Sequence, residues 1–161
     1  MKAITLSPLG RMAIAAPVVL RVVTGIVMAA HGWGKLSAGA AAFGNDMLAP
    51  LGIPAPVVVA YLQSFAELIG GVFLVVGFLS RIAAVVETTI LVLAILLVKV
   101  DIGLIAAPGA PLPGAELDLA LIAGLVGVML LGPGRPSVDH ALGVERDALA
   151  ATREGGSRLA A

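Results

Sequence analysis

The chain has 161 residues, of which 60% are apolar and only 12% are charged. An ordinary soluble domain carries roughly 25% charged residues, so this composition argues against a soluble globular enzyme. Ten basic and ten acidic residues cancel, which disfavours nucleic acid as a partner, and the absence of cysteine excludes disulfides and thiolate metal sites. The composition therefore indicates a membrane protein.

Four windows are long and apolar enough to cross a bilayer, which requires about 20 residues of helix. A helix satisfies its own backbone groups in hydrocarbon, and the apolar runs here are continuous, unlike the alternating strands of a barrel. We predict an all-α fold, a polytopic membrane protein built as a bundle of four transmembrane helices. In chain order, the predicted spans are 12–34, 56–80, 82–100 and 116–132.

Proline and glycine separate these spans. They predict loops at 45–56 and 106–113, whereas residues 79–81 leave room only for a tight hairpin. After the last span, Ser137 is placed to cap a short helix, and we expect segment 137–150 to dock on the bundle. We therefore predict a membrane bundle over 1–140 and a cytoplasmic C-terminal helix and disordered tail over 141–161.

Lysine and arginine residues are distributed unequally between the two sides of this predicted bundle. With four spans both termini share a side, and basic residues mark the cytoplasmic side. We therefore expect cytoplasmic termini, a bacterial-type inner (plasma) membrane, and outward loops at 35–55 and 101–115. The terminal side carries Lys2, Arg11, Arg81, Arg135, Arg146, Arg153 and Arg158, whereas the opposite side carries Lys35 and Lys99.

Two ionisable residues are predicted near the centre of the membrane. Arg21 follows the start of the first window by nine residues, and Glu67 follows the start of the second, from the opposite side, by eleven. We therefore predict that they pair at the midplane, with Gln63 on the same helical stripe as Glu67. Such a pair is either a structural link between two helices or part of a pocket that binds a headgroup or moves a proton.

A second group of ionisable residues is expected to converge at the outer end of the bundle, with Lys99, Glu116 and Asp118 near the outer ends of the third and fourth spans. His31 and Lys35 share one face of the first span, where His31 would exchange protons near neutral pH or donate to a quinone carbonyl. The alternative is an interfacial pair beside Trp33. With two histidines predicted on opposite sides, no metal site is expected.

The remaining charged residues are expected to serve structure. Glu87 is predicted to pair with Arg81 or to share Arg21, and Asp139 is placed to meet Arg81 or Arg135. The full set is Arg81, Glu87, Glu116, Asp118, Arg135 and Asp139.

Several motifs, in order, resemble those of the DoxX family over residues 16–140. They are Leu20-Arg21, HGWGKL at 31–36, ELIGG at 67–71, VGFLSR at 76–81 and GPGRPSVD at 132–139. Pro136 stands where an aromatic residue is commoner in the family, and Glu116 stands where an acid is frequent. The resemblance implies a compact four-helix membrane bundle. It also implies links to quinone-coupled oxidation of sulfur compounds and to membrane complexes that handle oxidative stress.

Two functional hypotheses follow. In the first, the chain is a membrane subunit of an oxidoreductase or oxidative-stress system that binds a quinone-like or other small hydrophobic ligand. Arg21, His31 and Lys35 would then donate hydrogen bonds, and Glu67 would relay protons. In the second, it is a non-enzymatic scaffold or small-ligand-binding protein that anchors soluble partners. Expected partners are the bilayer and soluble redox proteins, with homo-oligomer formation left open; a transporter is least favoured because no repeat or broken helix is visible.

Overall fold

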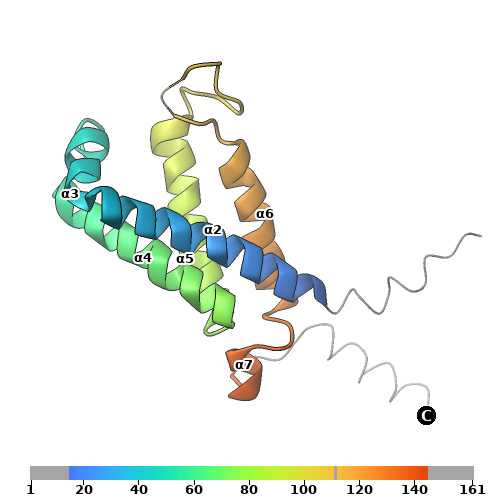
Figure 1. The fold of residues 1–161 in the computed structure, drawn as a ribbon. Coiled ribbons are helices and arrows are strands. Elements are labelled where there is room, and N and C mark those ends of the chain that lie inside the picture. The colour runs from blue at the N-terminus through green and yellow to red at the C-terminus, as the bar shows by residue number, and fades with distance from the viewer. Residues whose placement is uncertain (1–14, 111, 145–161) are drawn as a thin grey trace, which may run out of the picture.

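The computed structural model describes residues 15–110 and 112–144, and every regular element in these ranges is helical (Figure 1). The prediction of an all-α chain is thus confirmed for the described residues. In chain order the elements are α2 (Ala16–Ala38), α3 (Ala40–Phe43), the π-helical turn η2 (Gly44–Leu48), α4 (Pro56–Val76), α5 (Ser80–Ala94), the π-helical turn η3 (Ile95–Lys99), α6 (Glu116–Leu131) and α7 (Val138–Ala141).

Three helical segments of the described chain are long and apolar enough to cross a membrane. They are α2, α4 and the continuous segment Ser80–Lys99 formed by α5 and η3. The fourth predicted span corresponds to α6, which has 16 residues and is therefore only about 24 Å long. Three of the four predicted spans are thus supported by length and composition. The predicted start of the first span at residue 12 lies outside the described residues.

The second span ends earlier than its apolar run predicts, because Gly77 stops the helix. Its φ of 73° is left-handed, a conformation that costs glycine nothing sterically. The Gly77 N–H donates to the Phe73 and Leu74 carbonyls, and the Phe78 N–H reaches back to Phe73 at 2.9 Å. These bonds satisfy the last carbonyls of α4, and the next helix begins at Ser80 rather than at 82.

The connection from α2 to α4 is more helical than the sequence predicts. The loop expected at 45–56 begins only after η2, and α3 precedes it. Ala40, Gly44 and Leu48 are buried, and a Cβ at Gly44 would lie 2.8 Å from the Pro56 carbonyl oxygen. The small residues of this segment therefore pack closely on the start of α4, and that tertiary contact favours helix over loop.

Helices α2 and α4 pack closely along glycine residues. A Cβ at Gly25 would lie 2.7 Å from the Gly71 carbonyl oxygen, and one at Gly32 would lie 2.6 Å from the Ser64 carbonyl oxygen. Small residues of this kind allow helix backbones to approach in a membrane. These two contacts fix the antiparallel register of α2 and α4.

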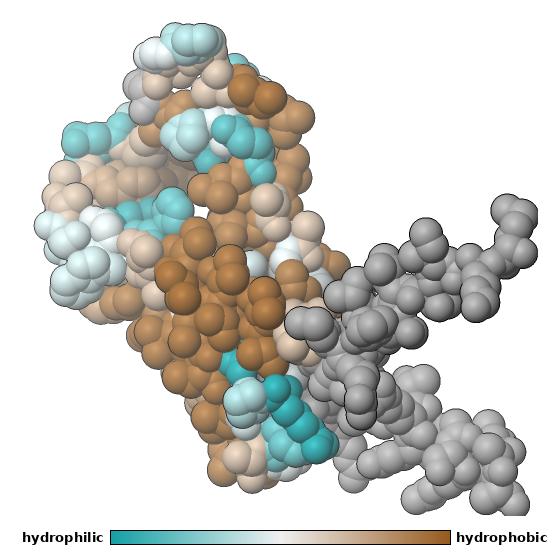
Figure 2. Space-filling view, turned by 45° about the vertical axis from the view of Figure 1, so that its right-hand side comes forward, coloured by the Kyte–Doolittle hydropathy of each residue, from teal (hydrophilic) through white to brown (hydrophobic). Residues whose placement is uncertain are grey.

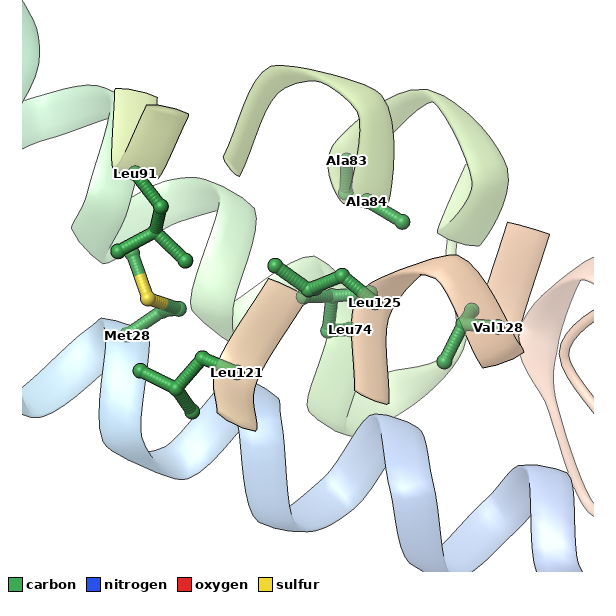
Figure 3. Close-up of a cluster of buried hydrophobic side chains, with 8 residues drawn as sticks. All are labelled: Met28, Leu74, Ala83, Ala84, Leu91, Leu121, Leu125 and Val128. Atoms are coloured by element: carbon green, nitrogen blue, oxygen red, sulfur yellow. The ribbon is translucent and has the colours of Figure 1, made fainter. Parts of the chain in front are cut away.

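A single apolar cluster joins the four long helices. Helix α4 packs on α5, α5 on α6, and α6 on α2, so that each helix contributes to the interior. Figure 3 shows the cluster, which consists of Met28, Leu74, Ala83, Ala84, Leu91, Leu121, Leu125 and Val128.

Many large apolar side chains lie on the outside of the bundle. Leu62 is 66% exposed and Leu130 is 70% exposed. Figure 2 shows apolar residues over the middle of the molecule and hydrophilic residues toward its two ends. A soluble protein does not leave so continuous an apolar surface uncovered, whereas a bilayer covers it.

We predict that Gly32→Ala lowers the free energy of unfolding by about 1–3 kcal/mol, because its methyl group would force α2 and α4 apart. Gly34→Ala is the matched control on the same helix, since a Cβ there meets nothing within 4 Å. Unfolding in mixed detergent micelles, followed by circular dichroism, measures both. Equal stability of the two variants would contradict the close contact.

Candidate functional site

The buried side chain of Arg21 links α2 by hydrogen bonds to α4 and to the turn after α6. Its side chain, 3% exposed, donates from Nε to the Pro133 carbonyl at 2.7 Å and from Nη1 to the Leu74 and Val75 carbonyls at 2.9 and 2.5 Å. Nη2 donates to the Pro136 carbonyl. Two acceptors lie in the last turn of α4, where the Leu74 carbonyl also accepts from the Gly77 N–H, and two lie in the turn after α6. The guanidinium fork therefore joins α2 to both helix ends.

The predicted Arg21–Glu67 pair is wrong. Contact of Gly25 with Gly71 places Arg21 beside the last turn of α4, whereas Glu67 lies two turns earlier on that helix. The predicted pairing requires the starts of the two windows, residues 12 and 56, to lie at opposite surfaces of the membrane. The glycine contacts between α2 and α4 impose a different register. The two residues mark separate regions, which we call the Arg21 end and the Lys35 region of the bundle.

Asp139 also serves structure at the Arg21 end. Its fully buried carboxylate accepts hydrogen bonds from the Leu79 N–H at 2.6 Å, the Ser80 N–H at 2.9 Å and the Ser80 hydroxyl at 2.7 Å. It thereby caps the first turn of α5. The sequence prediction, which placed Asp139 against Arg81 or Arg135, did not include this capping role. The Asp139 N–H in turn donates to the Gly77 carbonyl at 2.8 Å. The negative charge also attracts Arg21.

The docking predicted for segment 137–150 is therefore seen as far as the structure describes it. Ser137 caps α7 by accepting from the His140 N–H, as the sequence predicts. Residues 145–150 and the predicted tail to 161 lie outside the described residues.

Glu67 forms its ion pair in the Lys35 region. Lys35 Nζ contacts Glu67 Oε1, and Gln63 Nε2 donates to the same oxygen at 3.0 Å. Glu67 is 2% exposed, and its Oε2 has no hydrogen-bond partner. The Lys35 ammonium group also lies 5.2 Å from the centre of the Phe43 ring, within range of a cation–π interaction. The structure thus brings together three of the predicted site residues: Lys35, Gln63 and Glu67.

Glu87 lies near this ion pair, without hydrogen bonds. It is fully buried on α5, and neither of its carboxyl oxygens has a hydrogen-bond partner among the residues that the structure describes. The charges that act on it are those of Glu67 on α4 and Lys35 on α2. The predicted pairing with Arg21 or Arg81 is therefore not what the structure shows, because the α4–α5 packing turns this carboxyl toward Gly70.

An open groove adjoins the Lys35 region. It has a volume of about 660 Å³ and lies between α2 and the α3–η2 segment. Its walls are mainly apolar, and its polar groups are His31, Lys35 and Asp46. Asp46 is not among the predicted site residues, because residue 46 falls in a segment that the sequence predicts to be a loop. The lining is Ile26, Val27, Ala30, His31, Gly34, Lys35, Ala38, Gly39, Ala42, Phe43, Asp46 and Met47.

Lys99 and Asp118 form a further ion pair at 2.7 Å, near the ends of η3 and α6 where the sequence places them. Glu116 is exposed in the first turn of α6, where a negative charge stabilises the helix. Neither acid lines the groove, so this cluster is separate from the candidate site.

Comparisons with known proteins give one family and one curated relative. A family model described as DoxX matches residues 16–100. An uncharacterised membrane protein of Mycobacterium tuberculosis, Rv3486, is 33% identical over 108 residues. That alignment covers 60% of this chain and 66% of the relative, just under two thirds. No solved structure matches the chain.

We predict that Lys35 and Glu67 are energetically coupled, whereas Arg21 and Glu67 are not. In a double-mutant cycle, Lys35→Met and Glu67→Gln should show an interaction energy of about 1–2 kcal/mol, because they form one hydrogen-bonded pair. Arg21→Met and Glu67→Gln should be additive within about 0.5 kcal/mol. Detergent unfolding of the single and double variants provides the measurement, and coupling of Arg21 to Glu67 would restore the rejected pair.

Proposed function

The chain belongs to the DoxX family, and from that premise we propose that it is a membrane subunit of an oxidoreductase or oxidative-stress system. In this role it binds a quinone-like or other small hydrophobic ligand. The observation that supports the proposal is the apolar groove of about 660 Å³ with donors at one wall. Pockets for small ligands typically have volumes of about 300–1,000 Å³ and few polar groups among apolar walls.

The polar groups of the groove suit a carbonyl-bearing ring. His31 and Lys35 are hydrogen-bond donors, and both lie on α2 one turn apart. The apolar walls formed by Ile26, Val27 and Met47 suit an alkyl tail. The sequence also predicts Arg21 as a hydrogen-bond donor to the ligand. Arg21 has no part in this proposal, because its N–H groups donate to backbone carbonyl groups.

We further propose that α6 is the fourth span and that both termini are cytoplasmic. Two observations favour a membrane location for α6: it packs along α5, and Leu119 and Leu130 expose apolar surface. Local thinning of the bilayer would accommodate its length. The excess of lysine and arginine on the side of the termini supports the orientation.

Reporter fusions test this topology. A reporter inserted at Gly109, between η3 and α6, should be on the outer side, and one at the C-terminus should be cytoplasmic. A fusion at Gly52, between η2 and α4, serves as the matched outer control. If the Gly109 and C-terminal reporters lie on the same side, α6 does not span the membrane.

Quinone titration tests the ligand. Trp33 is the single tryptophan and follows His31 by two residues on α2, so a bound quinone should quench its fluorescence. With decyl-ubiquinone as the probe, we expect saturable quenching, and His31→Leu should weaken the affinity about tenfold, roughly 1.4 kcal/mol. His140→Leu, at the other histidine on α7, is the matched control and should bind as the unaltered protein does. Quenching that does not saturate, or is equal in both variants, would favour the scaffold hypothesis.

A further inference from the structure

Glu67 and Glu87 have buried carboxyl oxygens that neither line the groove nor cap a helix. Within residues 15–110 and 112–144, Glu87 is fully buried and both its oxygens lack a hydrogen-bond partner, and Glu67 Oε2 is likewise buried without one. An ionised carboxylate in apolar surroundings requires hydrogen bonds or a counter-charge. Glu67 obtains both through Oε1, from Lys35 and Gln63, whereas Glu87 obtains no hydrogen bond.

The two carboxyl groups approach the same part of the α4–α5 interface. Gly70 follows Glu67 by three residues and lies on the same helix face. The Glu87 carboxyl group occupies the place where a side chain at residue 70 would begin. Glycine at position 70 is therefore what admits this carboxyl group beside the ion pair.

The charges around Glu87 come from defined groups on α2, α4 and α6. Glu67 on α4 and Lys35 on α2 act on it directly. On α6, Asp118 is engaged with Lys99, and Glu116 is exposed. One lysine thus faces two carboxyl groups, so a single added proton makes the cluster neutral.

We propose that the Lys35–Glu67–Glu87 cluster is a proton-holding site, in which Glu87 carries a proton near neutral pH and shares it with Glu67. In the exchange, the O–H bond of Glu87 breaks and a new O–H bond forms at Glu67 Oε2. The negative charge passes from Glu67 to Glu87, and the total charge of the cluster is unchanged.

Lys35 connects this site to the groove, because its side chain lines the groove and contacts Glu67. In that exchange an N–H bond of the Lys35 ammonium group breaks and its proton passes to a basic acceptor in the groove, either water or a ligand oxygen. Lys35 takes the proton held on Glu67 in its place, and a proton from the groove later restores the cluster by the same route. The inference rests on the proposed function only in naming the groove as the route of exchange.

Infrared spectroscopy of the full chain in lipid nanodiscs, without quinone, tests the site. Near neutral pH we expect one carbonyl-stretch band of a protonated, buried carboxyl group, which shifts when water is replaced by D₂O. Glu87→Gln should remove the band, since Glu67 then remains ionised beside Lys35. Glu116→Gln is the matched control and should leave the band unchanged, because Glu116 is exposed.

Two further variants separate a shared proton from simple burial. Glu67→Gln should remove the band, because Lys35 then neutralises Glu87 as the single remaining carboxylate. Lys35→Met should roughly double its intensity, because both carboxyl groups then hold protons. Circular dichroism establishes that each variant is folded.

The proposal is overturned if the unaltered protein lacks the band or if the band survives Glu87→Gln. A band that survives Glu67→Gln would show that burial alone protonates Glu87, and the shared site would be rejected. Because these samples contain no quinone, their failure is distinct from failure of the quinone titration.

Discussion

The packing of this bundle depends on the hydrogen bonds that the buried Arg21 guanidinium group donates to backbone carbonyl groups in apolar surroundings. Arg21 donates to carbonyl groups at the end of α4 and in the turn after α6, from a position within α2. Unpaired carbonyl groups and an unpaired cation would each be costly in hydrocarbon. Their hydrogen bonds lower both costs and fix the position of three helix segments at one end.

The second constraint is the close approach of α2 and α4. Gly25 and Gly32 allow backbone contact with α4 and so set which residues lie opposite each other. That register assigns Arg21 to carbonyl groups and leaves Glu67 to Lys35. The same contact brings α3 and η2 against the start of α4, and the groove forms between them and α2.

Polar groups in the two regions differ in how completely they are satisfied. At the Arg21 end, the guanidinium group and the Asp139 carboxylate make several hydrogen bonds each, which is the usual state of buried polar groups that serve structure. In the Lys35 region, Glu67 and Glu87 retain oxygens without partners. Because these carboxyl oxygens lack hydrogen bonds and lie close to the groove, we place the proposed proton exchange in the Lys35 region and not at the Arg21 end.

The sequence by itself determined the membrane class, the helical fold and the approximate limits of the spans, because burial in hydrocarbon imposes length and continuous apolarity on a segment. Local chemistry also determined the Ser137 cap of α7. Only the tertiary structure decided the partners of Arg21, Glu67 and Asp139 and the burial of Glu87 without a hydrogen bond among the described residues. Apart from Gln63, which shares α4 with Glu67, the groups that these residues contact lie on other helices or in the connections between helices. A shift of one helical turn, which leaves the apolar pattern almost unchanged, alters such contacts. The register set by the α2–α4 glycine contacts was the deciding physical fact, and it follows from packing between helices rather than from the pattern along either one.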